Sequence, residues 1–195
     1  MNRKFLRITL IGLIALAALA SVWPALSAGL GIKLSVSEQS GSKAGAGLNG
    51  QHSGACTIDR PGVTLVVDFG SESNAKPLTY CAESTPTTGW EVFKAAGVEV
   101  FGTSQYPVGF TCRINGFPSR AQQDCQHTPT DSEGSWVYFT ASAKDENPGW
   151  RFSMIGSSMV HPNCGDYQGW RFVKGGYGST DKFPRVKPEP FSCDN

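Results

Sequence analysis

Six cysteines constrain the fold of this 195-residue chain more than any other feature of its sequence. Their number is even, and they follow an N-terminus of the export type, so we expect a chain that folds outside the cytosol and carries up to three disulfides. Sequential pairing is the arrangement we favour. It joins Cys56–Cys81, Cys112–Cys125 and Cys164–Cys193. The middle pair is favoured most because it closes a short loop, and the partners of the other two could be exchanged.

The N-terminal segment has the layout of a secretory signal. Basic residues are followed by an apolar run from Ile8 to Ala20 and by small residues at 25–28. This pattern predicts a signal peptide over residues 1–28. No charged residue occurs between Arg7 and Lys33, so the alternative is an uncleaved segment that anchors the protein in a membrane. Membrane association is expected only through this segment, and the protein is otherwise expected to be secreted or attached to the cell surface.

The rest of the chain divides into a linker and one domain. Residues 29–55 are rich in Gly, Ser, Ala and Gln and contain no aromatic residue, which predicts a flexible linker. Residues 56–195 are enough for a single domain. Its last part, 175–195, is rich in Gly and Pro and is expected to be irregular, with Cys193 tying it back to the body.

The charge of the mature chain excludes one class of partner. The signal peptide contains three basic residues and no acidic ones, so 14 basic and 16 acidic residues remain after its removal. A nearly neutral protein offers no electrostatic driving force for nucleic acid or anionic lipid. We therefore expect no nucleic-acid partner.

Short β-type segments alternate with a single helix. Strands are expected at 63–69, 78–81, 98–101, 109–114, 136–143, 150–155 and 168–173. Thr88 and Glu91 have capping-box spacing before a two-turn amphipathic helix that ends at Gly97, and Asn115-Gly116 predicts a hairpin turn. The prediction is an α+β fold: a mostly antiparallel sheet, stapled by disulfides, with one short helix packed on it.

Residues able to carry chemistry are scattered. A metal site could be sought at His127, His161, Cys164 and Asp166, and paired carboxylates for glycan hydrolysis at Asp68, Glu91, Asp131, Glu133 and Asp166. All six cysteines are better used in disulfides, and no nucleophile-elbow motif occurs. We therefore expect no catalytic residues, no metal and no cofactor. A cell-envelope hydrolase acting on glycan or peptide is the alternative.

Aromatic residues in the last third of the chain are the candidate binding residues. The four candidates for contact with a ligand are Trp136, Tyr138, Trp150 and Trp170. Strand alternation places Trp136 and Tyr138 on the face opposite Phe139, which favours that pair if Phe139 points to the core. The competing interpretation is that these rings simply fill the core.

Several motifs resemble those of a known family. They are Val63–Phe69, the helix end Ala95–Gly97, Cys112–Pro118, and the run from Trp136 through Trp150 to Phe172. Together they resemble an uncharacterised secreted domain common in actinobacteria, often found with cobalamin-type uptake components. The order of strand, helix and Asn-Gly hairpin is also similar to the C-terminal domain of the transcobalamins.

The resemblance implies a β-grasp-like sheet and a non-catalytic role in holding a ligand. This chain departs from the family in its extra tail at 175–195, and it lacks the helical partner domain of a transcobalamin. The sequence-based hypothesis is thus a secreted binding module for a small ligand, serving corrinoid-type uptake, or for an envelope or uptake protein. A tethered structural or adhesive surface protein is a further alternative.

Overall fold

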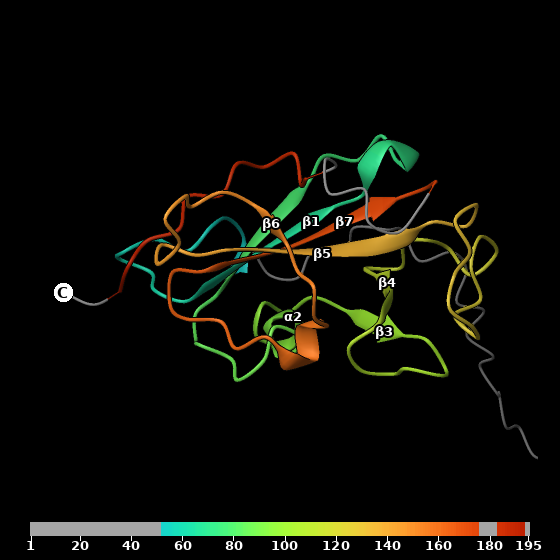
Figure 1. Cartoon of the computed structure of the whole chain (residues 1–195), viewed down its shortest axis with the longest axis horizontal. Coiled ribbons are helices and arrows are strands. Elements are labelled where there is room, and N and C mark those ends of the chain that lie inside the picture. The colour runs from blue at the N-terminus through green and yellow to red at the C-terminus, as the bar shows by residue number, and fades with distance from the viewer. Residues whose placement is uncertain (1–51, 176–182, 194–195) are drawn as a thin grey trace, which may run out of the picture. The chain divides into compact units, whose positions relative to one another are not determined.

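A computed structural model describes residues 52–175 and 183–193 (Figure 1). The predicted signal peptide, most of the predicted linker, and positions 176–182, 194 and 195 of the tail lie outside the described residues. The described residues belong to one compact unit. Among them, no helix has the length and apolar character needed to cross a membrane.

The main sheet has five strands and mixed topology. The strands are β1 (Val63–Asp68), β2 (Leu78–Ala82), β5 (Ser135–Ala141), β6 (Arg151–Phe152) and β7 (Tyr167–Val173). Their order is β2-β1-β7-β5-β6. The two central strands, β1 and β7, pair in parallel, whereas the other neighbours are antiparallel. The expected α+β fold is therefore present, but the sheet is mixed at its centre because the last strand inserts beside the first.

Both central strands are covered on both faces. Every residue of β1 is buried, as is all of β7 except Arg171. A strand buried on both sides is apolar on both faces, which explains why the apolar residues at 63–69 do not alternate with exposed ones. The sheet therefore separates two apolar layers.

The helix begins and ends where its capping residues predict. Helix α2 (Glu91–Ala95) is preceded by a capping box in which the Thr88 amide donates to the Glu91 carboxylate at 3.1 Å. The Glu91 amide donates to the Thr88 hydroxyl at 3.3 Å in return. Gly97 follows the helix with φ +67°, a left-handed conformation that suits glycine.

A small second sheet adjoins the helix. It consists of β3 (Val100–Gly102) and β4 (Thr111–Ile114), which pair antiparallel. Ile114 and Phe117 exchange two backbone hydrogen bonds of 2.9 Å across the predicted Asn115-Gly116 turn. Two single-turn 3-10 helices complete the described structure: η2 (Gly70–Glu72) and η3 (Ser157–Met159).

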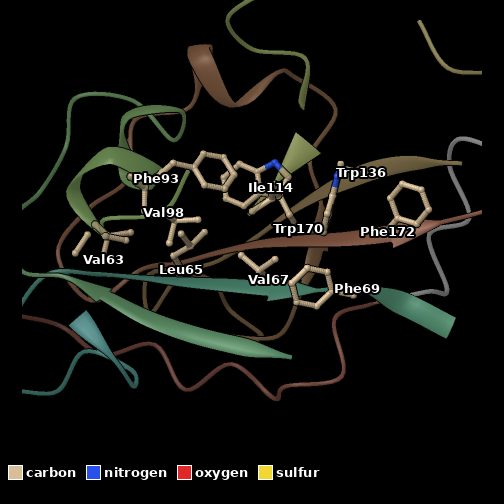
Figure 2. Packing of buried hydrophobic residues seen from close by; sticks show 13 residues of the cluster. Val63, Leu65, Val67, Phe69, Phe93, Val98, Ile114, Trp136, Trp170 and Phe172 are labelled. Carbon is tan, nitrogen blue, oxygen red and sulfur yellow. The ribbon is translucent and has the colours of Figure 1, made fainter. Parts of the chain in front are cut away.

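Helix α2 and β4 enclose an aromatic core with one face of the main sheet (Figure 2). Phe93 of α2 lies with its ring centroid 4.3 Å from that of Trp170 on β7. Side chains of β1 such as Leu65 and Val67 point toward this layer, and Ile114 of β4 lies across from them. We call this layer the helix-side core.

An irregular C-terminal segment covers the other face of the sheet. We call residues 183–193 the strap, which runs on the opposite side of the sheet from α2 (Figure 1, red). The Trp150 indole donates to the Val186 carbonyl at 2.7 Å, and the ring of Phe183 packs edge-on against Phe139. The strap thus performs the covering role that a second helix performs in other layered folds.

The six cysteines form three disulfides, paired sequentially as the sequence favoured. They indicate that the chain folds in an oxidising environment. Cys164–Cys193 joins the strap to the loop before β7, and Cys56–Cys81 joins β2 to the segment before β1.

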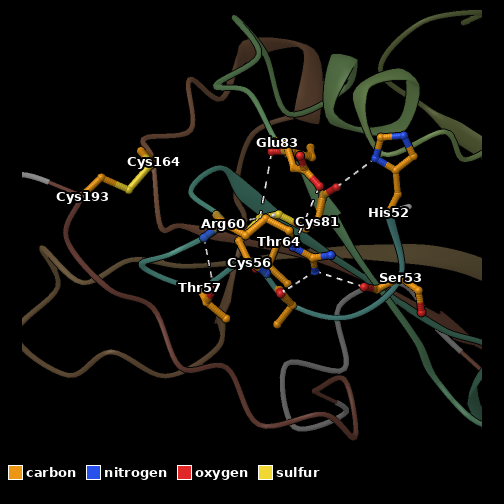
Figure 3. The surroundings of a disulfide bond; sticks show 12 residues. His52, Ser53, Cys56, Thr57, Arg60, Thr64, Cys81, Glu83, Cys164 and Cys193 are labelled. Atoms are coloured by element: carbon orange, nitrogen blue, oxygen red, sulfur yellow. Dashed lines mark hydrogen bonds and ion pairs between the residues drawn. A yellow bond between two sulfur atoms is a disulfide. The ribbon is translucent and has the colours of Figure 1, made fainter. Parts of the chain in front are cut away.

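The described part of that N-terminal segment starts at His52, inside the predicted linker, which was expected to run to residue 55 (Figure 3). The Gly54 amide donates to the Thr79 carbonyl at 2.9 Å, and Arg60 donates to the carbonyls of Ser53 and Ala55. Backbone pairing with β2 therefore orders residues 52–55, whose composition predicted a linker.

Candidate functional site

Two loops place apolar side chains in solvent at one end of the helix-side layer. The first joins β3 to β4, and the second joins β6 to η3 and continues through η3. The six apolar residues that they present, all exposed except the half-buried Phe110, are called the loop surface. They are Tyr106, Val108, Phe110, Met154, Ile155 and Met159.

The two loops touch each other. A Cβ atom built on Gly109 would lie 2.7 Å from the Ser158 hydroxyl, and one built on Gly156 would lie 3.6 Å from the Gly109 carbonyl oxygen. Because Gly109 has φ +92°, a side chain there would be strained as well as crowded. The two loops that carry the loop surface are therefore neighbours in space, although they are far apart in sequence.

Backbone hydrogen bonds fix η3 against the start of α2. The Trp90 amide donates to the Ser157 carbonyl at 3.1 Å, and the Gly89 amide donates to the Val160 carbonyl at 2.8 Å. Figure 1 shows η3, in orange, beside α2. These bonds satisfy amides that the first turn of the helix leaves unpaired, so the loop surface has a rigid base.

The loop surface contains no charge. Residues 102–112 and 152–160 include no Asp, Glu, Lys, Arg or His. Single exposed apolar residues are ordinary, but an uncharged group of several residues with Tyr and Met is typical of interaction surfaces. This chemistry suits a partner whose contacting face is also uncharged, since an unpaired charge would be desolvated at a cost.

An open groove of about 600 Å³ lies beside the loop surface, between α2 and β3. Its lining residues are Trp90, Glu91, Lys94, Gly97, Val98, Glu99, Val100 and Phe101. Gly102 connects it to the loop surface, because a Cβ there would lie 2.4 Å from the Tyr106 carbonyl oxygen. The apolar wall of the groove is Trp90, Val100 and Phe101.

A smaller cavity of about 350 Å³ lies beside the Cys164–Cys193 disulfide, and its character is polar. It is lined by Lys144, Asn163 and Asp166 among others, and the Lys144 ammonium donates to the Asn163 amide oxygen at 3.2 Å. Asp166 accepts from the Asn163 backbone amide at 2.7 Å, which fixes the loop before β7. These polar groups are used in loop structure.

Three of the four predicted aromatic residues lie in the helix-side core. Trp136 and Trp170 are 8% and 1% exposed, and the half-buried Tyr138 stacks at 4.5 Å on Trp170. Burial raises the pKa of Tyr138, with Asp166 adding to the rise, and its hydroxyl donates to Gln168. Trp150 lies on the opposite face, under the strap.

The four rings therefore do not form one platform. Phe139 points to the strap side rather than to the helix side, so Trp136 and Tyr138 face the larger of the two apolar layers. Their packing role follows from these contacts, while their ligand-binding role stays a prediction. The indole nitrogen of Trp136 is buried, and none of the described residues accepts a hydrogen bond from it.

The acidic residues considered for catalysis are separated or engaged. The Asp68 side chain is fully buried and accepts hydrogen bonds from the Arg185 backbone amide at 2.8 Å and guanidinium at 2.7 Å. Glu91 holds the helix cap. Among the described residues, no group of three His, Cys, Asp or Glu side chains could hold a metal ion.

One histidine does lie near two carboxylates. His127 is 3.6 Å from Asp124 and 3.5 Å from Glu133, on the exposed loop that follows Cys125. Glu133 is also tied to the Thr130 amide and hydroxyl, which lower its pKa together with His127. This group lines neither of the two cavities described above.

The strand and helix periodicities of the sequence do not reveal the loop surface, because its residues lie in two loops. Its one available signal was the absence of charge over 102–112 and 152–160. The sequence does not show that these two stretches touch.

Comparison with known proteins gives no relatives. The sequence matches no family model, and neither the curated proteins nor the solved structures contain a significant match.

Proposed function

We propose that this chain is a non-catalytic binding module of an extracytoplasmic compartment, which holds a protein partner through the loop surface. The observation that carries the proposal is the group of six apolar residues on two adjoining, uncharged and rigidly based loops. Protein interfaces are depleted in charge at their centre and enriched in Tyr, Phe and Met. The three disulfides support the choice of compartment.

A protein partner fits this surface better than a flat small ligand does. The three tryptophans expected to stack on such a ligand do not provide an exposed ring, because Trp136 and Trp170 are buried and Trp150 is covered by the strap. The resemblance to the actinobacterial secreted domain supports one specific version, in which the partner is an envelope or uptake protein and the module assists corrinoid-type uptake.

The β-grasp-like architecture is part of the same proposal. A hairpin of β1 and β2, a helix, and a final strand inserted in parallel beside β1 support it. In this arrangement the β3–β4 sheet is an insertion after the helix, and it contributes half of the loop surface.

The test is site-specific photo-crosslinking in the organism that makes the protein. A photoreactive side chain at Met154, which is 86% exposed, is expected to give a discrete crosslinked product with one protein. The matched control is Ile58, which is 69% exposed but belongs to neither loop. Equal crosslinking from Met154 and Ile58 would contradict the proposal.

A charge introduced beside the crosslinker sharpens the result. Met159→Lys is expected to abolish the Met154 product, because a buried ammonium without a partner is costly, while the isosteric Met159→Leu retains it. Thermal-shift and Trp-fluorescence measurements with corrinoids and glycans test the small-ligand version. A saturable response to one of them, unchanged by Met159→Lys, would replace the protein-partner proposal with a small-ligand function.

A further inference from the structure

We propose that the groove between α2 and β3 binds an extended peptide segment of the partner, which adds to the free edge of β3 as a strand. This inference rests on the proposed function, since it states the chemistry of the partner at the border of the loop surface. It commits to an extended segment with an apolar residue at its centre and charged residues on either side.

The register of β3 and β4 leaves one residue with free backbone groups. Ile114 uses its amide and carbonyl to bond Phe117, on the side of β4 away from β3. In an antiparallel pair, the amide and carbonyl of one residue point to the same side. Ile114 and its partner Val100 therefore form a non-hydrogen-bonded pair.

The neighbouring pair confirms this alternation. The Asn115 amide donates to the Glu99 carbonyl at 3.0 Å, so position 99 faces β4 and position 100 faces away. The amide and carbonyl of Val100 thus point out of the small sheet, and none of the described residues hydrogen-bonds them. Because β4 lies between β3 and β5, β3 is the outer strand (Figure 1).

Space for a strand exists at this edge. The groove of about 600 Å³ is bounded by Val98–Phe101 on one side and by α2 on the other. Phe101 is 48% exposed, and Trp90 is half-buried in the opposite wall. An added strand would bond the Val100 backbone and place alternate side chains against these rings.

The groove also carries two charged side chains that form no salt bridge or side-chain hydrogen bond with the described residues. Lys94 extends from α2, and Glu99 precedes β3, where the Arg113 guanidinium interacts with its carboxylate electrostatically. Glu91, the third charged residue of the lining, is already bonded to Thr88. A segment that combines an acidic residue near Lys94 with a basic residue near Glu99 therefore complements the groove.

An array of capped heptapeptides provides the probe. The three central residues alternate Val and Thr, and the flanking positions sample every combination of Asp, Lys and Ser. The full exported protein is expected to bind peptides with one Asp flank and one Lys flank best. Methylating the backbone nitrogen of the central residue removes a donor and blocks strand pairing, so it is expected to weaken binding about tenfold or more.

Val100 offers a matched pair of variants. Val100→Pro removes the amide that points outward but no hydrogen bond to β4, which is why an edge strand tolerates proline at such a position. Because the added strand would lose this donor, the variant is expected to abolish peptide binding. Val100→Thr keeps the amide and is expected to bind normally. The amide spectrum of β4 reports whether the variant keeps its fold. If Val100→Pro does not fold, Lys94→Glu, which should reverse the preferred order of the flanks, takes its place.

Amide shifts on peptide addition decide between the outcomes. Shifts centred on residues 98–102, lost in Val100→Pro, support the inference. Shifts confined to the loop surface, equal binding of the methylated peptides, or dimers of this chain formed through β3 overturn it. If no peptide binds while Met154 still crosslinks, this inference fails and the proposed function stands. If neither the crosslinking at Met154 nor the peptide array shows binding, both the proposed function and this inference are wrong.

Discussion

The two faces of the main sheet are covered in different ways. On one face, α2 and β4 pack apolar side chains against β1, β5 and β7. On the other face, the strap has no helix or strand among its described residues, and hydrogen bonds, an ion pair and a disulfide hold it. The backbone N–H and C=O groups of a helix or sheet hydrogen-bond to each other, whereas an irregular segment must find other hydrogen-bond partners for these groups.

This difference separates global stability from local attachment. Substitutions in the helix-side core remove area that the whole fold buries, so they are expected to affect unfolding of the entire domain. Substitutions at the strap anchors release one segment first, since local opening follows the contacts that hold it.

The largest loss of stability is expected for Trp170→Ala. Trp170 is 1% exposed and lies between Phe93 and Tyr138, so its removal leaves a large cavity at the centre of the sheet. The expected loss in the free energy of unfolding is about 3–5 kcal/mol. Urea denaturation followed by circular dichroism measures it. Met154→Ala on the exposed loop surface is the control, with a change within about 0.5 kcal/mol.

Removal of the Cys164–Cys193 disulfide is expected to come next. Its residues are 29 apart, for which the chain-entropy model gives an upper value of about 3–4 kcal/mol. Replacing both cysteines with Ser should speed hydrogen exchange in the strap and in the loop around Gly165 that precedes β7, while exchange in α2 stays slow. Equally accelerated exchange on both faces would contradict the separation between global and local stability.

The third effect concerns Asp68, where the strap meets the end of β1. Burial would raise the pKa of this carboxyl, but hydrogen bonds from Arg185 and Gly70, with Arg171 nearby, hold the pKa below its ordinary value of 3.8. Asp68→Asn is expected to cost about 3 kcal/mol, at the lower end of the range for breaking a buried ion pair. The lower end applies because the Arg185 side chain is 44% exposed and stays hydrated.

The same carboxylate predicts a dependence of stability on pH. Because the folded pKa lies below the unfolded one, its contribution is full above about pH 4 and is lost as the pH falls through the folded pKa. The wild-type protein should therefore lose more stability than Asp68→Asn between about pH 5 and pH 2. Parallel stability profiles for the two proteins would show that Asp68 does not anchor the strap.

The sequence predicts the helix-side layer better than the strap side, for the same physical reason. The strands, the helix cap and the Asn115-Gly116 turn arise from periodicity and local hydrogen bonding. Asp68 was considered only as a catalytic carboxylate, because its partner Arg185 is 117 positions away and no local pattern links the two. The parallel pairing of β1 and β7 is equally non-local.

The same limit explains the aromatic residues and the loop surface. Alternation correctly places Trp136 and Tyr138 on one face of the sheet, but it does not reveal which face packs against the larger apolar layer. The contact between Gly109 and Ser158 that unites the loop surface depends on tertiary structure. Composition showed only that each loop lacks charge.

The smallest effect is expected at the start of α2, where local sequence and tertiary contact can be separated. Thr88→Ala removes the hydroxyl that accepts from the Glu91 amide, at a cost of about 1 kcal/mol. Thr87→Ala is the matched control, because that residue contributes its backbone carbonyl to His161 and not its side chain. Glu91→Gln keeps a side-chain acceptor for the Thr88 amide and should cost less than Thr88→Ala. Since Trp90 also bonds η3, Thr88→Ala should additionally speed exchange of the Trp90 amide, and an unchanged rate there would show that η3 alone holds the helix start.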